Sequence, residues 1–425
     1  MIEALLARFP FDERLRTVAR SAARVAAAAD RSARDPVAFA VLGAFLDEGV
    51  NESDLAASFG YGYDDAARER YESLLARIFG CERALARLSL VSGTHAIVAA
   101  LGALLRPGDT LVAATGRPYD TLRNAIVEAE HSLVSRGIRY EEIRLGEKGV
   151  ALKALAERCA RGVAVVFVQR SRGYAPRRSL AAAECGAVVR AVKAAAPDAI
   201  VLVDNCYGEL VENTEPTHHG ADLVAGSLIK NLGGGLAPGG AYVAGRADLV
   251  ERVAAYHYAP GLGSALGPNL GFGRSLLAGL FGAANLVGES LAGLDFAAAL
   301  FAELGYEVDP GAGASRYDIV QAIRLGDLGL MLAFARGLQH ALPINARFRP
   351  EPGAVPGYRE PVVMSSGAFV SGATSELSCD GPLRPPYEIY LQGGTTREHV
   401  ALGALFAADA VLKESAASPT QKESR

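Results

Sequence analysis

The chain has 425 residues, of which 50% are hydrophobic and 21% are charged, so its composition is that of a globular protein too long for one ordinary core. The formal net charge of -4 gives no electrostatic reason to expect binding to nucleic acid or to an anionic membrane. No N-terminal stretch resembles a signal peptide, and charged residues or glycines interrupt every long apolar segment. We therefore expect neither export nor a membrane-spanning helix.

The cysteines and histidines are scattered and form no disulfide or metal-binding pattern. The five cysteines have no CxxC spacing, which argues against a structural zinc site and fits a reducing cytoplasm. The only adjacent histidines are His218 and His219, and neighbouring residues on a loop rarely share a metal ion. We predict a cytoplasmic protein without a metal centre.

Residues 1–70 are rich in alanine and arginine and are predicted to be helical, with a break at the polar, glycine-rich run 59–65. This segment is too thin to form a core alone. We expect it to be an arm that packs on the main body or on another subunit.

Residues 71–275 are predicted to form a large α/β domain. Short apolar runs rich in β-branched residues alternate with helical stretches, which favours a mostly parallel sheet with helices on both faces. The expected strands cover residues 110–113, 163–169, 200–204, 223–227 and 241–244. The expected helices cover residues 94–105, 119–136, 150–160 and 181–195.

Residues 276–412 are predicted to form a linker helix and a smaller α+β domain. A glycine-rich stretch, 259–273, precedes the long helix expected over 276–304. Beyond it, the expected strands are 318–324, 361–364 and 387–391, and the expected helices are 328–338 and 399–412. The polar end, 413–425, is expected to be a frayed tail.

Lys230 is the first candidate for chemistry. It follows the strand expected at 223–227 and precedes the glycines at 233–235, where a ligand or another backbone segment can come close. Desolvation lowers the pKa of a lysine, which suits formation of a Schiff base with an aldehyde. The competing interpretation is an ordinary surface lysine at the end of a strand.

Asp204 supports the chemical interpretation of Lys230. It ends the apolar run 199–203, and ligand groups in open α/β sheets gather at such carboxyl ends. A carboxylate there can keep the ring nitrogen of pyridoxal 5'-phosphate (PLP) protonated, so that the ring draws electrons from the substrate. An aspartate alone is also common as a turn cap, but together with Lys230 it predicts a PLP enzyme.

Ser92, Gly93 and Thr94 open a predicted helix. Small residues at a helix N-terminus offer free N–H groups and a favourable dipole to a phosphate. Ser227, shortly before Lys230, can add a hydroxyl to the same phosphate. A serine or threonine here is also an ordinary helix cap, so this motif alone is not specific.

Three segments in this order resemble the fold-type-I PLP enzymes: Ser-Gly-Thr-His-Ala at 92–96, Val-Asp-Asn-Cys-Tyr-Gly-Glu at 203–209 and Ser-Leu-Ile-Lys-Asn-Leu-Gly-Gly-Gly at 227–235. More narrowly, they resemble the family named for methionine γ-lyase and for aluminium resistance, a relative of the cystathionine β- and γ-lyases. Further matching stretches lie at 59–65, 116–121, 169–174, 381–387 and 390–394. The resemblance implies the aspartate aminotransferase fold and a homotetramer built from dimers with shared sites.

The resemblance also implies roles for single residues. Tyr119 would stack its ring on the cofactor, and Gln169 would approach the cofactor's phenolic oxygen. Tyr61 or Tyr63 would reach the phosphate of a neighbouring subunit, although this chain departs from the Tyr-x-Arg pattern that the lyases have there. Ile229 stands where the lyases carry a threonine, so other donors must replace one phosphate hydroxyl.

An amino-acid substrate needs a partner for its carboxylate, and the planar fork of an arginine can bind both oxygens. Arg384, in the predicted small domain, is the first candidate because related enzymes keep this residue there. Arg172, Arg347 and Arg397 are competitors, and an arginine on a loop is also common as a surface charge.

These observations predict a carbon–sulfur lyase that releases a thiol, a 2-keto acid and ammonia from a sulfur-containing amino acid, with Lys230, Asp204 and Tyr119 as catalytic residues. The substrate rests on the resemblance alone. The alternatives are a PLP-dependent aminotransferase or aldolase, and a PLP-binding stress or sensor protein with little turnover. A nicotinamide enzyme is disfavoured because the glycines at 261, 263 and 267 miss the dinucleotide fingerprint.

Overall fold

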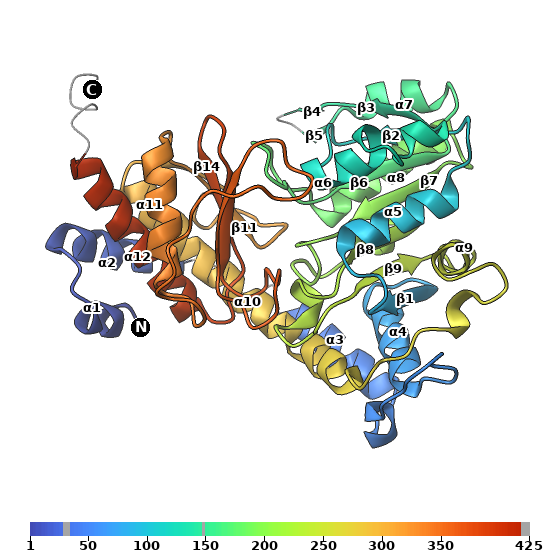
Figure 1. The fold of residues 1–425 in the computed structure, drawn as a ribbon, viewed down its shortest axis with the longest axis horizontal. Helices are drawn as coiled ribbons and strands as arrows, with labels where there is room; N and C mark the ends of the chain where they lie inside the picture. Colours follow the sequence, from blue (N-terminus) through green and yellow to red (C-terminus); the bar gives the residue numbers. More distant parts are fainter. Residues whose placement is uncertain (29–34, 147–148, 418–425) are drawn as a thin grey trace. The chain divides into compact units, whose positions relative to one another are not determined.

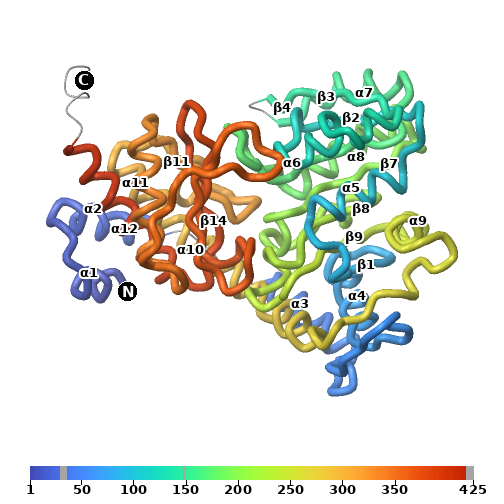
Figure 2. The backbone as a smooth tube through the Cα atoms, viewed as in Figure 1, coloured from blue at the N-terminus to red at the C-terminus, as the bar shows by residue number. Residues whose placement is uncertain are grey.

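The computed structural model describes residues 1–28, 35–146 and 149–417. Its contacts divide the chain into two compact units, whose elements are drawn in Figure 1 and Figure 2. We call Arg34–Ala284 the large unit, and Met1–Ala33 together with Asn285–Arg425 the terminal unit. The residues predicted to form an arm, 1–70, are therefore divided between the two units.

The large unit is built around a seven-stranded sheet in the order β1-β9-β8-β7-β6-β2-β3. The strands from β8 to β3 run parallel, whereas β9 is antiparallel to β8 and β1 is antiparallel to β9. The predicted mostly parallel α/β sheet is confirmed. The strands span β1 Arg83–Arg87, β2 Thr110–Ala113, β3 Arg139–Glu142, β6 Val165–Gln169, β7 Ile200–Asp204, β8 Leu223–Ser227 and β9 Ala241–Gly245.

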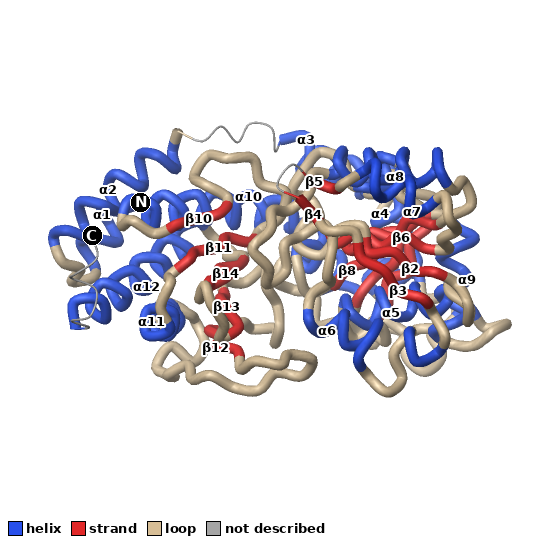
Figure 3. Tube along the Cα trace, turned by 90° about the horizontal axis from the view of Figure 1, so that it is seen from above, coloured by secondary structure: helices blue, strands red, loops and turns tan. Residues whose placement is uncertain are grey.

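Helices cover both faces of this sheet, as Figure 3 shows. α5 (Gly93–Leu104) and α9 (Ala247–His257) lie on one face, and α4 (Ala66–Ile78), α7 (Leu152–Cys159) and α8 (Ala182–Ala195) lie on the other. Every residue of β6, β8 and β9 is buried. Burial on both faces explains why these strands are continuous apolar runs without a strict alternation.

The continuous helix predicted over 119–136 is wrong. Buried Ser132 donates its hydroxyl to the Val127 carbonyl at 3.3 Å, and such local side-chain bonds compete with helical ones. The structure has instead α6 (Asp120–Arg123), a π-helical segment at Asn124–Glu128, extended Ala129 and a 3-10 turn at Val134–Arg136. The sequence pattern also did not predict β1, β3 or α9.

The terminal unit contains an antiparallel sheet in the order β10-β11-β14-β13-β12. Helix α11 (Leu328–Gln339) packs along α12 (Arg397–Ala417). The rings of Phe9 and Phe11 lie 5.2 and 5.6 Å from that of Phe406, which joins the N-terminal helices to α12. The remaining elements are α1 Ile2–Arg8, α2 Glu13–Ala27, β10 Glu307–Asp309, β11 Val320–Arg324, β12 Val362–Ser366, β13 Ser378–Pro382 and β14 Glu388–Gln392.

The two longest helices compare differently with the prediction. The long helix expected over 276–304 is confirmed, whereas α12 runs past its expected end at residue 412. By length and composition alone α10 (Gly273–Glu303) could cross a membrane, but most of its apolar window is buried inside the protein, as it is in core helices. Because α12 continues to Ala417, the frayed tail predicted from residue 413 is wrong for 413–417. Lys413 pairs with Asp409 one turn earlier at 2.6 Å and supports the helix there. Residues 418–425 lie outside the described residues.

The glycines after Lys230 permit a close approach between two backbone segments of the large unit. Gly234 has a φ of +53°, in the left-handed region, and a Cβ there would lie 2.2 Å from the Gly279 carbonyl oxygen of α10. Gly239, a few residues later, has open space around it. Only glycine therefore fits at position 234 without movement of α10.

We expect Gly234→Ala to destabilise the protein by about 2 kcal/mol or more, because the methyl group meets both a strained φ and the backbone of α10. Gly239→Ala is the matched control and should change stability by less than about 0.5 kcal/mol. Urea unfolding of the two variants measures the difference, and equal losses would contradict the close approach.

Candidate active site

The carboxyl ends of three neighbouring parallel strands meet at one edge of the large sheet. Gln169 ends β6, Asp204 ends β7 and Ser227 ends β8, and the register pairs Gln169 directly with Asp204. All three side chains are buried. Buried polar groups need partners, and these come from the segments that follow the strands.

Asp204 is held by the turn that follows it. Its Oδ1 accepts the backbone N–H of Cys206 at 3.1 Å. Burial raises the pKa of the Asp204 carboxyl, while this hydrogen bond and the positive charges of Lys230 and Arg177 act in the opposite direction. The aspartate therefore lies within the electrostatic reach of the lysine that the sequence singled out.

Lys230 stands between β8 and the 3-10 turn η6 (Asn231–Gly233). Its ammonium lies over the ring of Tyr207, with Nζ 3.4 Å from the ring centroid. Burial alone lowers the pKa of Lys230, but the neighbouring Tyr207, Cys206 and Asp204 outweigh burial and raise it. The lowered pKa expected from the sequence is wrong, because desolvation is only one of the forces at this position.

The N-terminus of α5 lies against the same edge. Ser92 caps the helix, since its hydroxyl accepts the N–H of His95 at 3.1 Å. A Cβ on Gly93 would lie 3.0 Å from Cys206 Sγ and 3.4 Å from the Cβ of Ser227. The structure thus brings the predicted phosphate-binding residues of α5 and β8 together, next to the turn after Asp204.

Tyr119 and Gln169 are joined to each other and to α5. The Tyr119 hydroxyl lies 2.8 Å from Thr94 Oγ1. Gln169 accepts the Tyr119 N–H at 3.1 Å through Oε1 and donates to the Ser171 carbonyl at 3.1 Å through Nε2. In the structure, Gln169 therefore orients the segment that carries Tyr119.

Arg177 and Tyr207 belong to this site but were not predicted. Arg177 donates to the carbonyls of Thr115, Arg172 and Ser171 at 2.5, 3.1 and 3.2 Å. Burial lowers the pKa of Arg177 to about 10, and the nearby Asp204 carboxylate opposes that shift. Tyr207 lies inside the segment 203–209 that carries the resemblance, but no local pattern indicates that its ring faces Lys230.

A family model described as methionine gamma-lyase matches residues 14–412. The chain belongs to the methionine gamma-lyase family. YnbB of Bacillus subtilis, itself uncharacterized, is 42% identical over 379 residues, which cover 88% of this chain and 90% of that protein.

Solved structures agree with this family. One from Clostridium acetobutylicum, provisionally named a cystathionine beta-lyase involved in aluminum resistance, has a TM-score of 0.90 at 36% identity and covers 96% of this chain and 98% of its own. One from Clostridium novyi NT, named a carbon-sulfur lyase involved in aluminum resistance, has a TM-score of 0.89 with the same identity and coverage. The PLP-dependent YhfS of Escherichia coli, at 20% identity, a TM-score of 0.57 and coverage of 91% and 96%, shares the fold alone. The family and its neighbours indicate a PLP-dependent carbon–sulfur lyase, as the sequence predicted.

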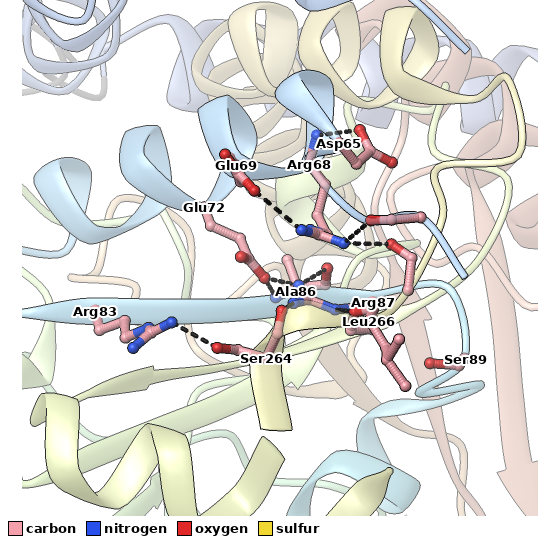
Figure 4. Close-up of polar contacts among 12 residues, drawn as sticks. Asp65, Arg68, Glu69, Glu72, Arg83, Ala86, Arg87, Ser89, Ser264 and Leu266 are labelled. Carbon is pink, nitrogen blue, oxygen red and sulfur yellow. Dashed lines mark hydrogen bonds and ion pairs between the residues drawn. The ribbon is translucent and has the colours of Figure 1, made fainter. Parts of the chain in front are cut away.

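In this methionine gamma-lyase family member, the arm tyrosines lie on an exposed loop. Tyr61 and Tyr63 are 71% and 58% exposed, and their ring centroids are 5.7 Å apart. Buried Arg68, seen in Figure 4, donates to the carbonyls of Gly62 at 2.6 Å and Gly267 at 3.1 Å. The base of the loop is thus anchored, while both tyrosine rings remain exposed.

A second buried arginine holds the loop that contains Ser264 and Leu266. Arg87, which ends β1, donates to the carbonyls of Ser264 at 2.9 Å and Leu266 at 3.0 Å (Figure 4). It also pairs with Glu72 of α4. Burial lowers the pKa of Arg87 to about 10. Arg68 and Arg87 together fix both loops through backbone carbonyls.

The candidate carboxylate ligands lie in both units. Arg384, after β13 in the terminal unit, has Nη1 3.4 Å from Glu360 Oε2. Arg397 is paired with Glu289, with Nε 2.9 Å from Oε2, and Arg347 is exposed. Arg172 belongs to the large unit and is buried.

A buried ion network supports the segment after Asp204. Arg170 is 0% exposed and donates to Asn205 Oδ1 at 2.6 Å, Glu215 Oε2 at 3.2 Å and Glu212 Oε2 at 2.5 Å. Its backbone N–H donates to the Asp204 carbonyl at 3.1 Å. One guanidinium therefore fixes the conformation of the segment that carries Asp204.

We expect Arg170→Ala to destabilise the protein by about 3–5 kcal/mol, because Glu215 would stay buried without its cation. Arg20→Ala, which removes an exposed ion pair with Glu3, is the control and should cause a far smaller loss. Thermal unfolding compares the two, and similar midpoints for both variants would contradict the supporting role of Arg170.

Proposed function

We propose that this protein is a PLP-dependent carbon–sulfur lyase that acts on a sulfur-containing amino acid. The observation that carries the proposal is the pair of opposite charges at the sheet edge. Asp204 ends β7, Lys230 follows β8, and the two attract each other. The family match and the name of the Clostridium novyi neighbour support the reaction class.

The side chains around this pair fit PLP. Asp204 is a buried acid in the field of two cations, which suits a partner for a protonated ring nitrogen. The α5 N-terminus supplies backbone N–H groups and the Ser92 and Thr94 hydroxyls to a phosphate, and Ser227 adds another hydroxyl. Gly93 keeps the space between them free, since a side chain there would press on Cys206.

When bound, PLP supplies an electron-poor ring that stabilises negative charge on the substrate α-carbon. Lys230 would hold the cofactor through Nζ and later take the proton from the substrate α-carbon. Asp204 would keep the ring nitrogen protonated. Tyr119 is half-buried and hydrogen-bonded to Thr94, and its ring would stack on the cofactor ring. Gln169 would hold Tyr119 in place by accepting its backbone N–H.

Loss of a sulfur leaving group from the substrate would give a thiol and an unsaturated amine, which water would hydrolyse to a 2-keto acid and ammonia. Arg384 is proposed to bind the substrate carboxylate. The exposed rings of Tyr61 and Tyr63 are proposed to meet a second copy of the chain in a cytoplasmic homotetramer built from dimers, since exposed aromatic residues are enriched at interfaces.

We expect the purified protein to absorb visible light through bound PLP. Lys230→Ala should lose the visible absorption band that arises from the bond between the cofactor and the Lys230 amine. Lys153→Ala, which changes a lysine that is 92% exposed, is the control and should keep the band. Absorption spectra before and after addition of PLP measure the effect. A wild-type protein that stays colourless after PLP is added would overturn the cofactor assignment.

We expect sulfur amino acids to release free thiol together with a keto acid, and we expect Asp204→Asn to reduce the rate by about 100-fold or more, since the ring nitrogen loses its charged partner. A thiol reagent and a keto-acid assay follow the two products. Turnover that requires an added keto acid and releases no thiol would favour an aminotransferase. Stable PLP binding without any product would favour a sensor protein.

A further inference from the structure

Asn231 follows Lys230 directly and is a buried polar residue to which the proposed function assigns no role. It is 0% exposed, and its side-chain Nδ2 donates to the Glu209 carbonyl at 2.7 Å and to the Tyr207 carbonyl at 3.0 Å. Because both partners are carbonyl oxygens, only the NH2 end of the amide can face them. The side chain of Asn231 therefore joins the turn after Lys230 to the segment that follows Asp204.

The segment that accepts these bonds has a strained backbone. Tyr207 has a φ of +70°, in the left-handed region that residues with a side chain rarely adopt. The carbonyl of Gly208, the next residue, accepts Nη1 of the buried Arg170 at 3.0 Å. Three successive carbonyls, those of 207, 208 and 209, are thus bound by only two side chains, Asn231 and Arg170. These bonds hold the segment in a conformation that it would not favour alone.

This conformation places the Tyr207 ring against the Lys230 amine. Nζ of Lys230 lies 3.4 Å from the centroid of the ring, and the face of an aromatic ring attracts an ammonium group. Both side chains are half-buried, and the attraction is stronger there than in open water. The contact between ring and amine spans the same two segments that the Asn231 amide joins.

We propose that Asn231 is a positioning residue for Lys230, because its two donated hydrogen bonds hold the Tyr207 ring against the lysine amine. The ring touches the amine itself, keeps Nζ in one place and favours its protonated form whenever the amine is free. Asn231 acts only through the ring. The inference deepens the proposed function, and it rests on that function where it takes Lys230 as the reacting amine.

Asn231 carries no charge, which makes its effect on Lys230 separable from direct electrostatics. Besides Tyr207, the titratable groups that act on the lysine include Asp204, Cys206 and Glu209, which lie at the end of β7 or on the segment after it. A substitution at Asn231 removes none of these groups. A change in the surroundings of Lys230 would therefore report a movement of its neighbours and not the loss of a charge.

The first test records the NMR signal of the lysine ε-CH2 group in full-length, PLP-free protein that contains isotope-labelled lysine. Groups above the face of an aromatic ring are shifted upfield, and Lys230→Ala identifies the signal. We expect an upfield Lys230 signal that returns towards its ordinary position in Tyr207→Leu and in Asn231→Leu, which donates no hydrogen bond. Asn269→Leu is the matched control, since it loses a buried amide that donates to the Ala56 carbonyl at 2.9 Å, and should leave the signal in place.

A Lys230 signal unmoved in folded Asn231→Leu would overturn the proposal, and so would an equal movement in Asn269→Leu, which would show a general loosening of the protein. If Asn231→Leu does not fold, Asn231→Ser replaces it. One hydroxyl can donate to only one of the two carbonyls, so the signal should move part of the way. An unmoved signal in Asn231→Ser would count equally against the role of Asn231.

The second test compares the rates at which an amine-reactive reagent labels Lys230 and Lys153 in the same PLP-free protein at neutral pH, read by peptide mass spectrometry. Lys153 is 92% exposed and serves as the internal reference. We expect Lys230 to be labelled about tenfold faster relative to Lys153 in Tyr207→Leu, because the amine loses the ring that holds its proton. Asn231→Leu should change the ratio in the same direction, and Asn269→Leu should not change it. An unchanged ratio in Tyr207→Leu would contradict the hold of the ring on the amine.

The two tests separate this inference from the proposed function, because neither measurement requires PLP. A Lys230 signal that depends on Asn231, in a protein that never binds PLP, would support the positioning role and overturn the proposed function. Conversely, a Lys230-dependent visible band together with an unmoved NMR signal in Asn231→Leu would support the cofactor and overturn the role of Asn231.

Discussion

The parallel order of β6, β7 and β8 is the constraint on which the site depends. Parallel strands end at the same edge of a sheet, so Gln169, Asp204 and Ser227 come together although they are far apart in the sequence. An acid buried at this edge is costly unless positive charge lies nearby. Lys230 and Arg177, on the segments that follow β8 and β6, provide that charge.

Three buried acids lie on the segment that begins at this edge. Burial raises the pKa values of Asp204, Glu209 and Glu215 alike, and the buried Arg170 pairs with Glu215. Tyr207, in the same segment, has a φ of +70°, an uncommon conformation for a residue with a side chain, and its carbonyl accepts the Asn231 side-chain amide at 3.0 Å. Packing, charge and backbone conformation thus support one another at the segment between β7 and Lys230.

The strands of the large sheet were predictable because burial on both faces selects continuous apolar runs, as in β7 and β8. β1 was not predictable, since its arginines at both ends suggest a surface segment. Arg87 is buried only because Glu72 and two carbonyls from a distant loop accept its hydrogen bonds. The break in the helix predicted over 119–136 likewise depends on Ser132 turning back to its own backbone.

The sequence by itself singled out Lys230 and Asp204 as candidates for the chemistry, because both the residue types and their places after predicted strands can be seen in local patterns. The tertiary structure alone decided that Tyr207 lies beneath the lysine, that Arg177 lies near the aspartate and that the Glu209 carboxyl is buried against Tyr242. It also decided that the pKa of Lys230 is raised. Such properties depend on distances between segments and on burial, and no window of sequence contains either quantity.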